Sequence, residues 1–350
     1  MRARSAAPLQ TKDGLHPRNR HRAGYDFERL GRSLPALAAF VTRNPVGRAT
    51  IDFTDPAAVK ALNQALLRAD YGIAQWDLPP GYLCPPIPGR VDYLHHLADL
   101  LSMGDDTAVP RGPSVAILDI GVGANCIYPL LGAQEYGWRF VGTELDPVAL
   151  RHAQQIVATN PAVAGRIDCR PQTQAAAIFR GAIAPGESFA ASICNPPFHA
   201  SADEAAAGTR RKLRNLGKKN AAPVRNFGGQ SNELWCDGGE LAFIRRMIAE
   251  SAQRPELCRW FTTLLAKSAH LPAVERALAQ ARVADVRIMP MAQGQKQSRI
   301  VAWTFFAKNG GAPVSGMVNA TPRPSARSPH RGGVVSQSGR TRKAHAKNAG

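Results

Sequence analysis

Apolar residues recur at helical spacing in the first third of the chain. Val59, Leu62 and Leu66 lie three or four residues apart and would share one face of a helix, so a helix is predicted over residues 54–71. The same spacing predicts a second helix over residues 90–103. Both helices precede a different pattern.

From residue 114 onward, short apolar runs alternate with stretches of helical spacing. The runs predict strands over residues 115–121, 138–144, 166–170, 189–195 and 257–266. The stretches predict helices near residues 125–136, 147–159, 173–182, 239–253 and 272–282. Two closing runs, 283–291 and 299–306, look like an antiparallel hairpin. Because alternating strands and helices form parallel crossover units, the sequence predicts an α/β fold with a mostly parallel, Rossmann-like sheet that ends in this hairpin.

The chain is strongly basic. Its 44 Lys and Arg residues outnumber 26 Asp and Glu residues, which gives a formal net charge of +18 and a pI of about 10.3. This balance favours a polyanionic partner, first of all nucleic acid, over an acidic small substrate. The basic groups are most concentrated at the ends, where residues 1–24 hold six with one acid and residues 309–350 hold seven with none.

Cysteine spacing and hydropathy exclude several classes of protein. The six cysteines are scattered without a C-x-x-C pair, which favours neither a zinc site nor a secreted disulfide framework. No run approaches the ~20 apolar residues that a membrane span needs, and the basic N-terminus lacks the apolar region of a signal peptide. A soluble protein of the reducing cytoplasm, with no membrane partner, is therefore expected.

A glycine-containing loop follows the first strand of the α/β region. The strand ends at Asp119, and Gly121 and Gly123 then allow a ligand to approach the backbone closely. A third glycine is absent because position 126 is Cys, which argues against a dinucleotide pyrophosphate. Glu144 ends the next strand about 20 residues later, where an acid can accept hydrogen bonds from ribose hydroxyls. The motif favours S-adenosylmethionine over NAD, and a tight turn without a ligand is the alternative.

The stretch "SICNPPFHAS" puts a carboxamide at the end of the fourth predicted strand. Asn195 would therefore lie beside the cofactor, since ligands bind at the carboxyl ends of parallel strands. Its amide oxygen and a main-chain carbonyl could accept both hydrogens of an exocyclic amine. Pro196 and Pro197 stiffen the loop, and Phe198 offers a face on which a base can stack. The alternative is an ordinary strand-ending turn with a buried aromatic residue.

Eight sequence blocks between residues 14 and 307 resemble a known family. They are, in order, "GLHPRNRH", "IDFTDPAAVKALNQALL", "CPPIPGRVDYLHHLADLL", "ILDIGVGANCIYPLLG", "EYGWRFVGTE", "CNPPFH", "NFGGQSNELWCDGGE" and "MAQGQKQSRIVAWTF". The chain resembles the bacterial large-subunit ribosomal RNA methyltransferase F family, the 23S rRNA (adenine(1618)-N(6))-methyltransferases, which are related to the eukaryotic U6 small nuclear RNA adenine methyltransferase. The resemblance implies S-adenosylmethionine as cofactor, and 23S rRNA or a large-subunit assembly intermediate as partner. The sequence does not determine the oligomeric state, for which a monomer is the default expectation.

The motifs and the resemblance together name the expected site residues. Those expected to bind the cofactor are Arg90, Asp119, Gly121, Gly123, Glu144, Gln174 and Asn195, and those expected at the catalytic loop are Asn195, Pro196, Pro197 and Phe198. Arg90 matches a family arginine that reaches the methionine end of the cofactor, and a surface ion pair is its alternative role. Gln174 follows the third strand, where the resemblance implies a contact with the cofactor adenine.

Four regions are expected along the chain. Residues 1–24 form a basic, partly flexible arm, residues 25–110 a helical region, residues 111–308 the methyltransferase domain, and residues 309–350 a disordered basic tail. Composition leaves open whether the tail only aids solubility or also attracts RNA.

Two basic segments are the expected RNA contacts. Residues 14–27 form an arm suited to phosphate contacts, or alternatively a lid packed on the catalytic domain. Residues 208–229 carry many cations and no acid directly after the catalytic loop, although a solvated loop would have the same composition. The predicted RNA-binding residues are Arg18, Arg20, Arg22, Arg210, Arg211, Lys212, Arg214, Lys218 and Lys219.

Three functions remain open on the residues alone. The first is methylation of an adenine amine in RNA. The second is methylation of a guanine amine or a protein glutamine, because related N-P-P loops also serve planar amides. The third is a non-catalytic RNA-binding role in ribosome assembly, against which the intact Asp119, Gly121, Gly123, Glu144 and Asn195 argue.

Overall fold

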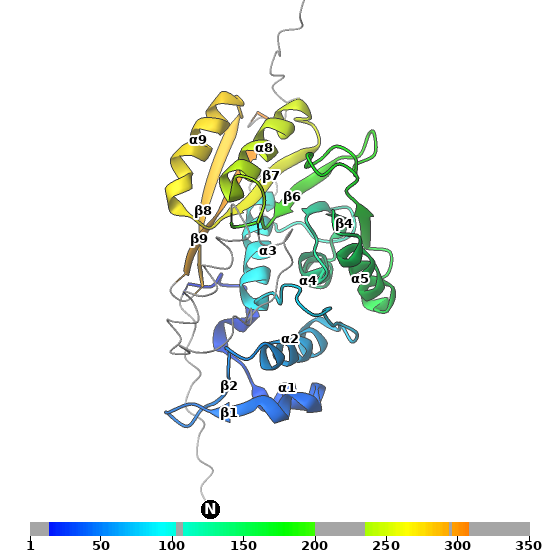
Figure 1. Ribbon diagram of the computed structural model, residues 1–350, viewed down its shortest axis with the longest axis vertical. Helices are drawn as coiled ribbons and strands as arrows, with labels where there is room; N and C mark the ends of the chain where they lie inside the picture. Colours follow the sequence, from blue (N-terminus) through cyan, green and yellow to red (C-terminus); the bar gives the residue numbers. More distant parts are fainter. Residues whose placement is uncertain (1–13, 103–107, 200–234, 294–295, 308–350) are drawn as a thin grey trace, which may run out of the picture. The chain divides into compact units, whose positions relative to one another are not determined.

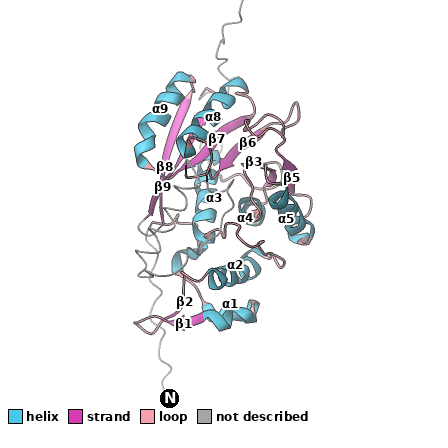
Figure 2. Cartoon of the chain, viewed as in Figure 1, coloured by secondary structure: helices cyan, strands magenta, loops and turns pink. Residues whose placement is uncertain are grey.

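A seven-stranded sheet forms the centre of the part of the chain that the structure describes, residues 14–102, 108–199, 235–293 and 296–307 of a computed structural model. Its strands are β3 (Ala116–Ile120), β4 (Arg139–Glu144), β5 (Ile167–Pro171), β6 (Phe189–Cys194), β7 (Cys258–Leu265), β8 (Asp285–Gln293) and β9 (Lys296–Thr304). The strand order is β5-β4-β3-β6-β7-β9-β8, drawn in magenta in Figure 2. The first five are parallel and β9 runs antiparallel to β7 and β8, which confirms the predicted sheet and hairpin.

Helices cover both faces of the sheet (Figure 1). They are α3 (Ile87–Ser102), α4 (Ile127–Tyr136) and α5 (Pro147–Ala158) on one face, and α8 (Gly239–Gln253) and α9 (Leu271–Gln280) on the other. Side chains alternate along each strand, so Ile117 of β3 packs in the apolar cluster of the first three helices and Leu118 in that of the last two. No helix in the described ranges is both long and apolar enough to cross a membrane.

The residues before α3 pack on the same face as α4. They form α1 (Phe27–Ser33), a two-stranded hairpin of β1 (Val41–Arg43) and β2 (Ala49–Ile51), and α2 (Pro56–Tyr71), with short 3-10 helices at Arg20–Ala23 and Pro35–Phe40. Two further 3-10 helices, Pro161–Val163 and Ser268–His270, lie later in the chain. Asp55 caps α2 through the amide of Ala57, and Gly72 ends the helix in the left-handed region at φ 65°. Buried side chains of α1 and α2 join the apolar cluster of α3 and α4, so this region supports the helix from which Arg90 projects.

Residues 173–182 form turns, and the helix predicted there is wrong. The amides of Ile178 and Phe179 donate to the carboxylate of Glu250 on α8, at 3.0 Å, instead of to carbonyls one turn earlier. Gly181, at φ 91°, closes the segment on itself, because a Cβ there would meet side-chain atoms of the segment at 2.8–3.0 Å. A side chain distant in the sequence thus takes the donors that a helix would use.

Candidate active site

A cavity opens at the carboxyl ends of β3, β4 and β6. There the direction of the strand order changes, because β4 and β5 follow on one side of β3 and β6 and β7 on the other. Its volume is about 900 Å³, part of it open solvent. Six of the predicted site residues line it: Arg90, Gly121, Gly123, Glu144, Asn195 and Pro197. The sheet therefore brings together residues that span more than a hundred positions of the chain.

The glycine loop forms the floor of this cavity. Gly121 and Gly123 have φ values of 73° and 65°, in the left-handed region that favours glycine. A Cβ built on Gly121 meets no atom within 4 Å, so the space above it is free for a ligand. The amides of Gly121 and Val122 both donate to the carbonyl of Thr143 at 3.0 Å, which fixes the loop against β4.

Backbone amides hold the carboxylate of Glu144. It accepts hydrogen bonds from Gly123 at 2.9 Å, Leu145 at 2.8 Å and Asp146 at 3.0 Å. Burial raises the pKa of Glu144, and the three amides act in the opposite direction. Next to it, Leu145 lines the cavity and is 43% exposed.

Arg90 and Asp119 are buried and leave polar atoms without partners. Arg90, near the start of α3, donates from Nη1 to the hydroxyl of Tyr128 at 2.7 Å. Its Nε and both carboxylate oxygens of Asp119 have no hydrogen-bond partner among the described residues. Burial, with the nearby Glu144, raises the pKa of Asp119 to about 8 against the opposing effect of Arg90. Asp119 itself does not line the cavity.

Strand β6 is locked in place before it delivers Asn195. The amide of Thr262 on β7 donates to Oγ of Ser192 at 3.1 Å, and its hydroxyl donates to the carbonyl of Ser192 at 2.6 Å. Tyr93 of α3 hydrogen-bonds that same hydroxyl at 2.8 Å. The two Thr262–Ser192 contacts tie β6 to β7, and the Tyr93 contact ties β7 to α3, so β7 and, through it, α3 hold the strand that ends before Asn195.

The amide oxygen of Asn195 is buried and has no hydrogen-bond partner in the described part of the chain. Buried acceptors are almost always paired, so an unpaired one beside a cavity marks a place for a ligand donor. Pro197 lines the cavity, Pro196 is buried behind it, and Phe198 is half-buried and not part of the lining. The loop therefore turns its carboxamide to the cavity, whereas its phenylalanine lies outside that space.

Comparison with known proteins identifies the family. A family model described as RNA methyltransferase matches residues 9–307. The chain belongs to this RNA methyltransferase family. The Ribosomal RNA large subunit methyltransferase F of Serratia proteamaculans is 58% identical over 298 residues, 85% of this chain and 89% of that protein. The protein of the same name from Yersinia enterocolitica is 55% identical over 297 residues, 84% of this chain and 89% of its own length.

Solved structures agree with this assignment. The hMettl16 catalytic domain in complex with MAT2A 3'UTR hairpin 1 is 30% identical, with a TM-score of 0.69 over 84% of this methyltransferase and 96% of that chain. The N-terminal domain of human METTL16 in complex with SAH gives a TM-score of 0.65 at 30% identity, over 83% and 99%. The predicted methyltransferase fold, the dependence on S-adenosylmethionine and the resemblance to the methyltransferase F family are confirmed.

The methyltransferase cavity also has walls that sequence reasoning did not find. Gln172 lines it, whereas Gln174, two residues later, does not. The Gln172 carboxamide is fixed from both sides, since Oε1 accepts from the amide of Gln174 at 2.9 Å and Nε2 donates to the carbonyl of Ile178 at 3.1 Å. Leu83, before α3, and Phe243, on α8, also line the cavity. Neither lies in a motif, and only the tertiary fold reveals them.

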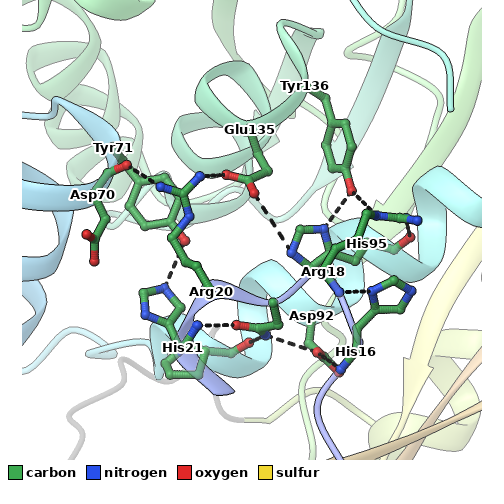
Figure 3. Close-up of polar contacts among 12 residues, drawn as sticks. His16, Arg18, Arg20, His21, Asp70, Tyr71, Asp92, His95, Glu135 and Tyr136 are labelled. Carbon is green, nitrogen blue, oxygen red and sulfur yellow. Dashed lines mark hydrogen bonds and ion pairs between the residues drawn. The ribbon is translucent and has the colours of Figure 1, made fainter. Parts of the chain in front are cut away.

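The basic N-terminal segment packs against the methyltransferase through its polar side chains (Figure 3). Arg18 donates to Asp99 at 2.6 Å and to the carbonyl of His95 at 2.9 Å. Arg20 pairs with Glu135 and donates to the carbonyl of Asp70 at 2.8 Å. The packing described as the alternative to a free arm is thus present in residues 14–24.

Asn19 and Arg22 of the same segment differ in their bonding. The side-chain nitrogen of Asn19 donates to the carbonyl of Pro88 at 2.9 Å and to the carboxylate of Asp92 at 3.0 Å, on either side of Arg90. Arg22 has no ion pair, and its Nε has no hydrogen bond, among the described residues. The other predicted RNA-binding residues, Arg210, Arg211, Lys212, Arg214, Lys218 and Lys219, lie outside the described residues, as does the tail 309–350.

Proposed function

We propose that this methyltransferase modifies the exocyclic N(6) amine of one adenine in 23S ribosomal RNA, free or in a large-subunit assembly intermediate, in the cytoplasm. The observation that carries the proposal is the unpartnered amide oxygen of Asn195 at the cavity. Two relatives above 50% identity are named for large-subunit ribosomal RNA, which supports the choice of RNA. The formal charge of +18 agrees with a polyanionic substrate.

The cavity has the groups that S-adenosylmethionine needs. Arg90 has an unpaired Nε for the carboxylate of the methionine part, and the buried Asp119 lies close enough to Arg90 and Glu144 for both to act on its pKa. Glu144, held by three amides, would accept hydrogen bonds from ribose hydroxyls. Bound there, S-adenosylmethionine supplies an electrophilic methyl group. The unpaired polar atoms thus match the polar ends of the cofactor.

The protein's own part of the reaction is to orient the amine. The Asn195 oxygen would accept one amine hydrogen and a main-chain carbonyl of the same loop the other, which turns the nitrogen toward the methyl group. Pro196 and Pro197 hold that loop with fixed φ angles. Phe198, half-buried outside the cavity, would stack on the target base at the entrance. No strong base is required, because the proton can leave after transfer.

The substitution Asn195→Ala tests this role. We expect methyl transfer to fall at least about a hundredfold, the usual effect of removing one hydrogen-bond partner of a transition state. Affinity for SAH (S-adenosylhomocysteine), measured by calorimetry, should stay within about twofold because Asn195 is assigned to the substrate amine. Wild-type turnover by the variant would contradict the mechanism.

The target is tested by mass spectrometry of ribosomal RNA, mapped to position, and of ribosomal proteins from cells with and without the gene. We expect one N(6)-methyladenine to be missing from 23S RNA. A missing methylguanine, or a missing methylglutamine in a ribosomal protein, would replace the adenine assignment. Unchanged RNA and protein would favour a non-catalytic role in ribosome assembly.

A further inference from the structure

The segment 172–181 forms one wall of the cavity without a helix or strand of its own. Gln172, Ala177 and Ile178 line the cavity from this segment. A segment without regular backbone hydrogen bonds keeps a shape only if other groups bind its amides and carbonyls. Contacts with other elements must therefore hold this wall.

The carboxylate of Glu250 supplies that contact. Both of its oxygens lie 3.0 Å from the amide of Ile178, and one also accepts from the amide of Phe179 at 3.0 Å. Glu250 is only 7% exposed, and no Lys or Arg of the described ranges pairs with it. Its charge is therefore stabilised by the segment's amides, and hydrogen bonds to an ionised acceptor are roughly twice as strong as neutral ones.

The helix α8 that carries Glu250 also lines the cavity itself. Phe243 lies seven residues earlier, on the same face of the helix, and lines the cavity. The segment is closed from its other side by Gln172, which donates to the carbonyl of Ile178 at 3.1 Å. Phe179 packs edge to face on Phe261 of β7 with ring centroids 5.6 Å apart, so its side chain is held as well. One helix face thus presents both a residue that lines the cavity and the anchor of the lining segment 172–181.

We propose that Glu250 is a positioning residue for cofactor binding. By holding the amides of Ile178 and Phe179, its carboxylate keeps the segment 172–181 in the shape that lines the cavity before the cofactor enters. The free-energy cost of ordering this segment then arises during folding and does not reduce the affinity for the cofactor. This proposal rests on the assignment of the cavity to S-adenosylmethionine, and it does not depend on which base is methylated.

The variant Glu250→Gln tests the proposal with little change in size. Its carboxamide has lost the charge and has one oxygen instead of two for the amides. We expect SAH affinity to fall about tenfold, the scale of losing a charged hydrogen-bond partner. The KM for S-adenosylmethionine should rise in parallel while kcat at saturating cofactor stays near the wild-type value. Amide hydrogen exchange in residues 172–181 should be faster in the ligand-free variant.

Glu240 provides a matched control on the same helix. It is 1% exposed and accepts hydrogen bonds from the amides of Ala266 and Lys267, which do not line the cavity. We therefore expect both Glu240→Gln and Glu250→Gln to lower Tm, but Glu240→Gln to leave SAH affinity unchanged. Equal losses of SAH affinity in the two variants, or none in Glu250→Gln, would overturn the proposal.

Two further variants separate the possible failures. Arg90→Met tests the assignment of the cavity to the cofactor, and unchanged SAH affinity in that variant would refute it. A loss of SAH affinity in Arg90→Met with no loss in Glu250→Gln would refute only the role of Glu250. If Glu250→Gln does not fold, the double variant Ala175→Gly and Ala176→Gly takes its place. Both alanines are exposed in the segment and outside the cavity lining, so glycine adds only backbone freedom. Weaker SAH binding in it supports the proposal, and unchanged binding contradicts it.

Discussion

The N-terminal segment and the cavity both bring arginines close to acids, but the two regions differ in how these groups are bonded. Arg18 of the segment has Asp99 at 2.6 Å and two further acceptors. In the cavity, Arg90 has the hydroxyl of Tyr128 as its hydrogen-bond partner, and both oxygens of the nearby Asp119 have none among the described residues. Arg18 and Asp99 thus satisfy each other, whereas Arg90 and Asp119 keep polar atoms without a partner in the described part of the chain.

This difference separates charges that stabilise the fold from charges kept for a ligand. A buried polar atom without a partner costs about 1–3 kcal/mol, so a protein retains one only where something else repays that cost. Arg90, Asp119 and Asn195 hold four such atoms at or next to the cavity, although single unpaired atoms also occur elsewhere, as at Arg22. A cluster of unpaired atoms at one cavity, and not residue type or burial, is what marks the site.

The largest effect is expected from Arg90→Met. The variant removes hydrogen bonds from a cation, each worth about 1.5–3 kcal/mol, so SAH affinity should fall on the order of a hundredfold. The matched variant Arg18→Met should leave SAH affinity unchanged and lower the urea midpoint of unfolding instead. Calorimetry with SAH and urea titration of both proteins measure the two effects. Equal behaviour of the two variants would remove the distinction between the regions.

Asp119 makes the stability of the ligand-free protein depend on pH. Burial raises its pKa to about 8 in the folded state, whereas an unfolded Asp titrates near 4. Only the unfolded state therefore loses the proton between these values, so the stabilisation from Asp119 is complete below about pH 4 and is lost as pH rises through about 8. The slope is at most about 1.4 kcal/mol per pH unit.

The variant Asp119→Asn cannot titrate and should flatten this slope. Urea unfolding of both ligand-free proteins between pH 6 and 9 measures the free energy of unfolding at each pH. The difference in this free energy between the wild type and the variant should become smaller as pH falls. A slope that the substitution leaves unchanged would show that Asp119 is not the group responsible. Glu144 and Arg90 act on Asp119 and are present in both proteins, so the two proteins differ only in the group at position 119.

Most of the fold could be predicted because its patterns are local. The helix predicted over 239–253 matches α8, and the strand predicted over 138–144 differs from β4 by one residue. The glycine loop and Glu144 were found at the cavity for the same reason, since a strand, a turn and an acid near in sequence define them. Periods of 3.6 and 2 residues suffice where each element pairs with its immediate successor.

The rest depends on contacts between distant residues. The carboxylate of Glu250 accepts hydrogen bonds from the amides of Ile178, 72 residues earlier, and Phe179. These amides are then not available to the helix that local spacing favours at 173–182. In the turns that form there instead, Gln172 and not Gln174 lines the cavity. Arg20 is drawn to Glu135, 115 residues away, and composition offers no means of finding such a partner.

The smallest effects are expected within the N-terminal segment itself, at two arginines with the same predicted role. Arg20 is paired with Glu135 and its side chain is 43% exposed, so Arg20→Ala should cost at most about 1 kcal/mol of stability. Arg22 has no ion pair among the described residues and is the better phosphate contact. Arg22→Ala should weaken binding of a 23S RNA fragment and reduce the slope of log affinity against log salt by about 0.7–0.9, the contribution of one phosphate contact. Its urea midpoint should stay at the wild-type value. If Arg20→Ala lowers the salt slope as much as Arg22→Ala does, the ion pair between Arg20 and Glu135 breaks when RNA binds. An ion-paired arginine in this segment would then also contact RNA, and its pairing would not show a purely structural role.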